Sequence, residues 1–150
     1  MSISAKYVHT NLVAKDWKKL SLFYQEVFGC ISLPPERDLS GPAIESATGI
    51  PSAHIRGEHI RLPGWGDQGP SLEIFSYTPE MEHPNPAVNR PGFGHLAFQV
   101  DSVEQAINAV LARHGQQIGE MVKVQVGSGF VTFCYLTDPE GNILEVQSWS

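Results

Sequence analysis

The hydrophobic and polar positions fall into two successive segments that repeat one order of elements. In the first segment, residues 7–13 mix β-branched, apolar and polar residues in loose alternation, which predicts a strand. Apolar residues then recur three and four positions apart, which predicts a helix that begins after the N-cap Asp16 and ends at Gly29. Further strands are expected at residues 30–33, 55–62 and 72–77.

The second segment follows the same order. A strand is expected over 94–100, and an apolar stripe from Val103 to Leu111 predicts a helix that ends at His114-Gly115. Three more strands are expected at 118–126, 129–136 and 143–147. We therefore expect one domain of fold class α+β, built from two tandem βαβββ modules at about 5–78 and 92–148, with a linker at 78–91 that contains four prolines.

Residues 34–53 are expected to form an irregular excursion with one helical turn near 43–47. So long a connection in a compact domain is typical of a substrate lid or specificity loop. Arg37, Glu45 and Arg56 are candidate substrate contacts in and beside it.

Two histidines and two glutamates repeat with the modules. His9 and His95 each open a strand, and each is followed twenty residues later by a glycine. Glu73 and Glu145 each sit in an apolar strand, in Leu-Glu-Ile and Leu-Glu-Val. Two imidazoles and two carboxylates form a ligand set for a divalent transition metal. The repeat therefore predicts a metal site built by internal duplication.

Single members of this set can arise without a metal. Either glutamate alone could point to solvent from an edge strand, but a carboxylate inside an apolar strand is costly to bury without a cation. The remaining histidines are expected in loops, at strand edges or at a helix end, and mostly exposed; they are His54, His59, His83 and His114.

Composition narrows the class of protein. The 150 residues carry a formal charge of −6 without a cluster of Lys or Arg, so no nucleic-acid surface is expected. No apolar run approaches the length of a membrane span, and we expect a cytoplasmic protein with no membrane partner. Cys30 and Cys134 are expected to be buried, reduced thiols.

Two motifs carry a family resemblance. The chain resembles the vicinal oxygen chelate superfamily in Gly-Phe-Gly-His-Leu-Ala-Phe-Gln-Val at 92–100 and in Thr-Asp-Pro-Glu-Gly-Asn-Ile-Leu-Glu at 137–145. That superfamily includes glyoxalase I, methylmalonyl-CoA epimerase, extradiol dioxygenases and fosfomycin-resistance thiol transferases. The resemblance implies paired βαβββ modules in a mixed sheet that curls around a metal, and a homodimer. The metal ligands it implies are His9, Glu73, His95 and Glu145.

The resemblance implies a divalent ion, which can be Zn²⁺, Ni²⁺, Co²⁺, Mn²⁺ or Fe²⁺, and a glyoxalase I-like lyase or isomerase. The ion would chelate adjacent oxygens of a small substrate, and proton transfer would proceed through an enediolate. Glu145 is the first candidate for the general base and Glu73 the second. Val13 and Tyr77 stand where glutathione contacts are expected, so a different small oxygenated substrate is favoured.

Three alternatives remain from the sequence. One is an epimerase similar to methylmalonyl-CoA epimerase. Another is an extradiol-type dioxygenase that uses His9, His95 and Glu145, which a fourth ligand at Glu73 disfavours because dioxygen and catechol need open positions. The third is a non-catalytic protein that binds a drug in its cleft, which the intact ligand set disfavours.

Overall fold

A computed structural model describes all 150 residues, which form two compact units, residues 1–81 and 82–150. Each unit is described by itself. The first contains β1 (His9–Val13), α1 (Trp17–Phe28), β2 (Ile31–Ser40), α2 (Pro42–Thr48), β3 (His54–Arg61), a short 3-10 helix (Gly66–Gln68) and β4 (Ser71–Thr78). The second contains β5 (Leu96–Gln99), α3 (Val103–Ala112), β6 (Gln116–Gln117), β7 (Val122–Val126), β8 (Gly129–Thr137) and β9 (Ile143–Trp149).

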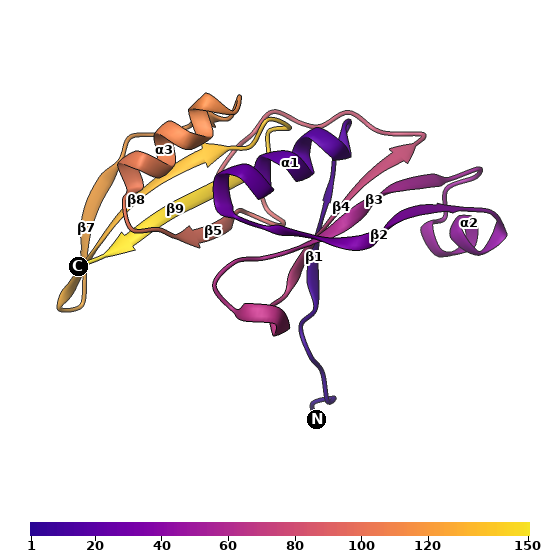
Figure 1. Cartoon of the computed structure of the whole chain (residues 1–150), viewed down its shortest axis with the longest axis horizontal. Coiled ribbons are helices and arrows are strands. Elements are labelled where there is room, and N and C mark those ends of the chain that lie inside the picture. The colour runs from indigo at the N-terminus through magenta and orange to yellow at the C-terminus, as the bar shows by residue number, and fades with distance from the viewer. The chain divides into compact units, whose positions relative to one another are not determined.

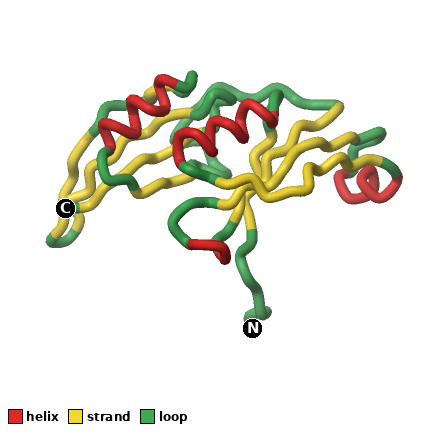
Figure 2. Tube along the Cα trace, in the orientation of Figure 1, coloured by secondary structure: helices red, strands yellow, loops and turns green.

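Each unit has one mixed sheet with a helix along one face (Figure 1). The strand order is β1-β4-β3-β2 in the first unit and β5-β9-β8-β6 in the second, where β7 also pairs with β8. In both units the first strand runs parallel to the last, and the other pairings are antiparallel. Strands dominate both units, with few helices (Figure 2), and the predicted α+β class is confirmed.

Side-chain caps begin both long helices where the sequence predicts. The Asp16 carboxylate accepts a hydrogen bond from the backbone N–H of Lys19 at 3.2 Å, and the Ser102 hydroxyl accepts one from Gln105 at the same distance. Gly29 ends α1 with φ 72°, a left-handed conformation that glycine adopts without steric cost.

The helices decide which face of each sheet forms the core. Leu72 and Ile74 on β4 are fully buried on the side of α1, and Leu144 and Val146 on β9 are fully buried on the side of α3. Successive residues of a strand point to opposite faces. The glutamate between each apolar pair therefore projects from the face opposite the helix, which we name the far face.

The far face of the first sheet has a close approach at Gly57 on β3. A Cβ atom there would lie 2.0 Å from the carbonyl oxygen of Ile74 and 2.6 Å from the ring of Phe75. Only glycine fits this position, because any side chain would overlap the neighbouring strand.

The expectation of an irregular loop over 34–53 is wrong, although the helical turn near 43–47 is present as α2. Strand β2 continues through Pro34 and Pro35, with an irregularity in its register between Leu33 and Arg37. An edge strand tolerates prolines because one side of its backbone needs no N–H donor for the sheet. The strand expected over 118–126 is shorter than predicted, because β7 covers only Val122–Val126; the short strand β6 lies before the predicted range.

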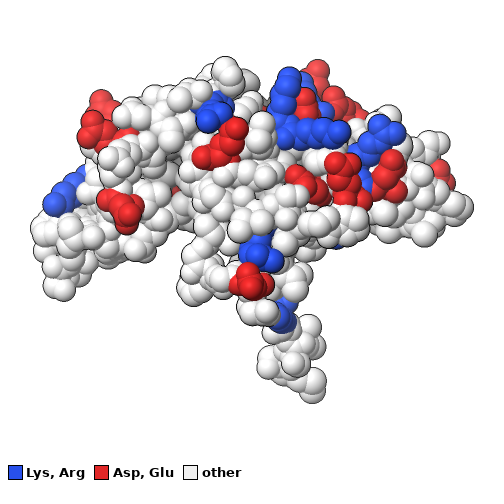
Figure 3. All heavy atoms as spheres, in the orientation of Figure 1, with Lys and Arg blue, Asp and Glu red and all other residues white.

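No helix is long and apolar enough to cross a membrane. On the face of the first unit shown in Figure 3, acidic and basic side chains are interspersed, without a large patch of one sign.

Candidate functional site

Glu73 occupies the centre of a polar group on the far face of the first sheet. In the strand register it lies opposite Asn11 on β1 and opposite His59 on β3. His9 begins β1 two residues before Asn11, so its side chain points to the same face. Four polar side chains from three neighbouring strands thus meet on the far face of this sheet.

The carboxylate of Glu73 has a partner on each oxygen. Asn11 Nδ2 donates to Oε1 at 3.0 Å, and His59 Nε2 lies 2.7 Å from Oε2. His9 Nε2 lies 3.6 Å from Oε1. Two hydrogen bonds from different strands therefore fix the orientation of this carboxylate.

His59 is held at both ring nitrogens. Its Nδ1 lies 3.1 Å from the hydroxyl oxygen of Ser71, so a neutral ring can donate from Nε2 to Glu73 and accept from Ser71. Burial lowers the pKa of His59 below its usual value, the charge of Glu73 opposes that shift, and the nearby charge of Arg37 adds to it. The environment therefore favours the neutral imidazole.

The donor atoms of His9, His59 and Glu73 lie within 4.8 Å of one another. Imidazole nitrogens with a carboxylate oxygen are a common ligand set for Zn²⁺, Fe²⁺, Ni²⁺ and Co²⁺. The chemistry of this set therefore fits the divalent ion that the resemblance implies.

The second unit contains one further histidine–glutamate pair. His95 directly precedes β5, and its Nε2 lies 2.9 Å from Oε2 of Glu145 on β9. The ring of Tyr135 contacts His95 edge-on at 5.2 Å between centroids, and Phe133 contacts Tyr135 at 5.6 Å. Aromatic rings therefore pack beside His95 of this pair.

The two pairs occupy equivalent register positions. Glu73 lies opposite the residue two positions after His9, and Glu145 lies opposite Ala97, two positions after His95. The duplication seen in the sequence thus holds in the pairing of the strands.

The residues around the two glutamates differ. Asn11 and His59 flank Glu73, whereas Ala97 and Tyr135 occupy the corresponding places beside Glu145. The carboxylate of Glu73 therefore has hydrogen-bond donors on both neighbouring strands, and Glu145 is paired with its histidine.

The expectation that His59 is a loop or edge residue is wrong, because it lies on the inner strand β3 with a side chain only 17% exposed. The sequence around it alternates poorly because β3 carries polar groups on both faces. Glu58, next to it, is buried on the side of α1 and accepts hydrogen bonds from the hydroxyls of Ser21 and Ser32. The sequence did offer one signal for His59: pairing of the predicted strands 55–62 and 72–77 can place it opposite the candidate ligand Glu73.

The other candidate contacts have structural partners. Glu45 accepts from the backbone N–H of Ser52 at 2.7 Å, and Arg56 Nε lies 3.6 Å from Asp38. His54, also on β3, hydrogen-bonds Asp38, and this contact lowers the pKa of the Asp38 carboxyl.

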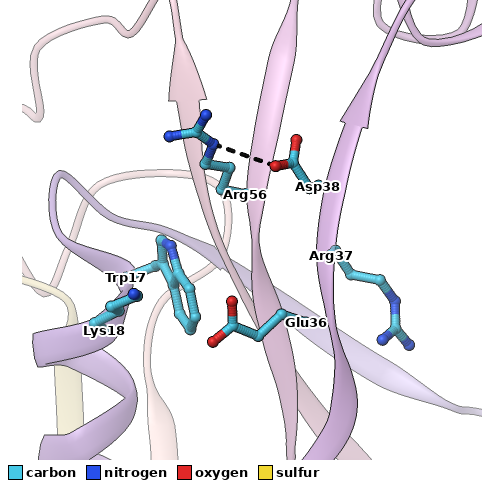
Figure 4. A pocket seen from close by; sticks show the side chains of 6 residues that line it. All are labelled: Trp17, Lys18, Glu36, Arg37, Asp38 and Arg56. Atoms are coloured by element: carbon cyan, nitrogen blue, oxygen red, sulfur yellow. Dashed lines mark ion pairs between the residues drawn. The ribbon is translucent and has the colours of Figure 1, made fainter.

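A pocket of about 290 Å³ lies in the first unit, lined by Trp17, Lys18, Glu36, Arg37, Asp38 and Arg56 (Figure 4). Trp17 begins α1, so the pocket lies on the helix side of the sheet. In Figure 4 the side chain of Arg37 leaves β2 away from Trp17, Glu36 and Asp38. The pocket is thus separated from Glu73 by the sheet.

The family model described as Glyoxalase/Bleomycin resistance protein/Dioxygenase superfamily matches residues 6–146. No curated protein sequence matches the chain.

Solved structures are similar in fold. A glyoxalase family protein from Bacillus cereus has a TM-score of 0.82 at 16% identity, over 99% of this chain and 96% of that one. A glyoxalase/bleomycin resistance protein/dioxygenase family enzyme from Burkholderia phytofirmans has a TM-score of 0.63 at 16% identity, over 96% and 98%. The fosfomycin resistance protein FosX from Listeria monocytogenes has a TM-score of 0.62 at 19% identity, over 99% and 96%.

Proposed function

The chain belongs to the Glyoxalase/Bleomycin resistance protein/Dioxygenase superfamily, and from this we propose that it is a divalent-metal-dependent lyase or isomerase of the glyoxalase I type. The proposed substrate is small and carries oxygens on adjacent atoms. The proposed reaction moves a proton at a carbon beside those oxygens.

The proposed metal ligands are His9, Glu73, His95 and Glu145. The observation that supports them is the repeat of one histidine–glutamate pair at equivalent register positions, with contacts of 3.6 Å in the first unit and 2.9 Å in the second. Zn²⁺, Ni²⁺, Co²⁺, Mn²⁺ and Fe²⁺ all accept such ligands. When bound, such an ion supplies Lewis-acid polarisation of the substrate oxygens.

The flanking residues divide the roles of the two carboxylates. Asn11 and His59 hold Glu73 through both oxygens, which suits a ligand of fixed geometry. Glu145 has Ala97 in place of the amide and Tyr135 in place of the imidazole. We therefore assign the proton transfer to Glu145, as the sequence favours, with Glu73 as the second candidate.

Two residues of the first unit disfavour glutathione as part of the substrate. Val13 and Tyr77 provide no amide or guanidinium group where the glyoxalase I resemblance calls for glutathione contacts. A charge-assisted hydrogen bond contributes about 1.5–3 kcal/mol, so its absence disfavours glutathione adducts.

The homodimer and the cytoplasmic location stay predictions, and light scattering at micromolar concentration tests the dimer.

Proton exchange tests the proposed reaction without knowledge of the product. Protein loaded with Ni²⁺, Co²⁺, Zn²⁺ or Mn²⁺ is incubated in D₂O with 2-hydroxy ketones and with 2-oxoaldehyde–thiol adducts, and NMR follows loss of the signal from the proton beside the carbonyl. We expect exchange with at least one compound and one metal. We expect Glu145→Gln to slow it at least tenfold while protein folding is retained.

Glu104→Gln is the matched control, because Glu104 is an exposed residue in the first turn of α3 in the same unit. It should exchange at the wild-type rate. Absence of exchange with every compound and metal, in protein shown to contain metal, would reject the lyase or isomerase proposal.

One observation favours a second candidate. His9, His59 and Glu73 together give two imidazoles and one carboxylate, the set that non-haem Fe²⁺ oxygenases use. An extradiol-type dioxygenase would then consume dioxygen with catechol in the iron-loaded protein, and an oxygen electrode measures this directly.

A further inference from the structure

We propose that Arg37 binds an anionic group of the substrate, a carboxylate, phosphate or phosphonate, on the far face of the first sheet. This inference rests on the proposed function, since it assigns a chemical class to the substrate of the same site. The argument depends on where the guanidinium lies and on which acidic groups it meets.

The strand register places Arg37 beside the polar group around Glu73. Arg37 lies opposite Gly57, and Gly57 precedes His59 by two residues on the same face of β3. Arg37 is thus a diagonal neighbour of His59. Such neighbours lie about 7–8 Å apart between Cα atoms, within reach of a long side chain. In keeping with this placement, the positive charge of Arg37 contributes to the lowered pKa of His59.

The row of the sheet that contains Arg37 continues with Gly57 on β3 and Phe75 on β4. A Cβ atom at Gly57 is excluded by the carbonyl oxygen of Ile74, so no side chain stands between Arg37 and Phe75 in this row of the sheet. The ring of Phe75 lies over Gly57, 2.6 Å from where a Cβ atom would be, so a ligand that extends from Glu73 toward Arg37 would pass along this apolar ring.

The charge of Arg37 has no acidic partner within 4.0 Å, unlike those of the two arginines on β3. Arg56 pairs with Asp38 at 3.6 Å, and Arg61 pairs with Asp67 at 3.2 Å. The guanidinium of Arg37 instead donates to the backbone carbonyl oxygen of Pro35. This hydrogen bond ties it to the irregular part of β2 and leaves further N–H donors available.

Acidic residues near Arg37 are engaged or lie on the other face. Both oxygens of Glu73 already have partners in Asn11 and His59. Glu36 and Asp38 project from β2 in a direction different from that of Arg37 (Figure 4). A partly buried cation without a counter-ion gains most from an anion supplied by the ligand. The planar guanidinium matches the paired oxygens of a carboxylate or phosphate.

A pair of probes with the same chelating end tests the proposal. Glycerate and 3-phosphoglycerate share adjacent carboxylate and hydroxyl oxygens, and only the second carries a phosphate beyond them. Calorimetric titration of both into Mn²⁺-loaded protein gives their affinities for wild type, Arg37→Ala, Arg37→Lys and Arg56→Ala. Metal content and circular dichroism are measured on each variant.

Wild type should bind 3-phosphoglycerate at least tenfold more tightly than glycerate. Arg37→Ala should lose about tenfold in affinity for 3-phosphoglycerate with no change for glycerate, and Arg37→Lys should fall between. Arg56→Ala, which removes an arginine on the neighbouring strand, should behave as wild type. An unchanged preference in Arg37→Ala, or no preference in wild type, would overturn the assignment.

The proposed function and this inference fail separately. Protein that takes up no metal contradicts the proposed function, and 3-phosphoglycerate titrated into the metal-free protein then still reports whether its binding depends on Arg37. Protein that takes up metal and binds both probes equally contradicts only the role of Arg37.

Discussion

Glu73 and His59 lie directly opposite each other on β4 and β3, with 2.7 Å between Oε2 and Nε2. The same position beside Glu145 is occupied by Tyr135. The sheets of the two units thus carry a glutamate at the same register position, and the residue opposite that glutamate differs between them. This difference makes Glu73 the better candidate for a fixed ligand and Glu145 for the group that transfers a proton.

Asn11→Ala should weaken metal binding by about tenfold, because it removes the donor to Oε1 of Glu73 and frees that carboxylate to rotate. Competition with a chromogenic chelator measures the affinity. Thr10→Ala is the matched control, since Thr10 precedes Asn11 on β1 and points to the other face. Equal affinities for the two variants would show that Asn11 does not support the metal site.

Gly57→Ala should destabilise the protein by about 1–3 kcal/mol, because the new methyl group overlaps the carbonyl oxygen of Ile74. Urea denaturation followed by fluorescence gives the free energy of unfolding. Gly119→Ala serves as the control, since a Cβ atom there meets nothing within 4 Å. A Gly57→Ala protein as stable as Gly119→Ala would contradict the packing described for β3 and β4.

Ser21→Ala should cost about 1–3 kcal/mol of stability, because the Ser21 hydroxyl donates to the buried carboxylate of Glu58 and accepts from Gln25 at 2.9 Å. Thermal unfolding measured beside Ser128→Ala, an exposed turn residue, separates this loss from that of an ordinary serine. If both variants melt at the wild-type temperature, the Glu58 network does not stabilise the first unit.

Cys30 should be unreactive in the folded protein, because burial raises its pKa from 9.0 to about 12. At pH 9, we expect iodoacetamide to modify it at least tenfold more slowly in the folded protein than in urea-unfolded protein, as read by peptide mass spectrometry.

The same shift sets a pH dependence of stability. Above pH 9 the unfolded thiol ionises while the folded thiol keeps its proton, so stability should fall as pH rises from 9 toward 12. Cys30→Ala should show a smaller fall over this range. Equal pH dependence in both proteins would contradict the raised pKa.

The elements that sequence predicted best are those with strong local signals. The helix after Asp16 and the helix after Ser102 have side-chain caps and regular apolar stripes, and both form where expected. Strand β2 was cut short at Pro34 in the prediction because prolines weaken a strand pattern. Only the tertiary position of β2 at the edge of the sheet makes them acceptable.

The candidate site was predictable only where its residues follow a local, repeated spacing. The histidine–glutamate repeat is visible in sequence because the modules share one spacing. His59 is not part of that repeat, since Tyr135 replaces it in the second unit. Its contact with Glu73 depends on the antiparallel register of β3 and β4, which local pattern does not specify. The position of Arg37 beside His59 depends on register in the same way.

Metal content per chain tests the central claim most directly. Elemental analysis is made on wild type, Glu73→Ala and His95→Ala, purified without chelators, with Glu104→Gln as the control. We predict about one divalent ion per chain in wild type and Glu104→Gln, and loss of the ion in both ligand variants. Wild-type protein without metal, unrecovered after addition of Ni²⁺, Co²⁺, Zn²⁺ or Mn²⁺, would contradict the metal-dependent function.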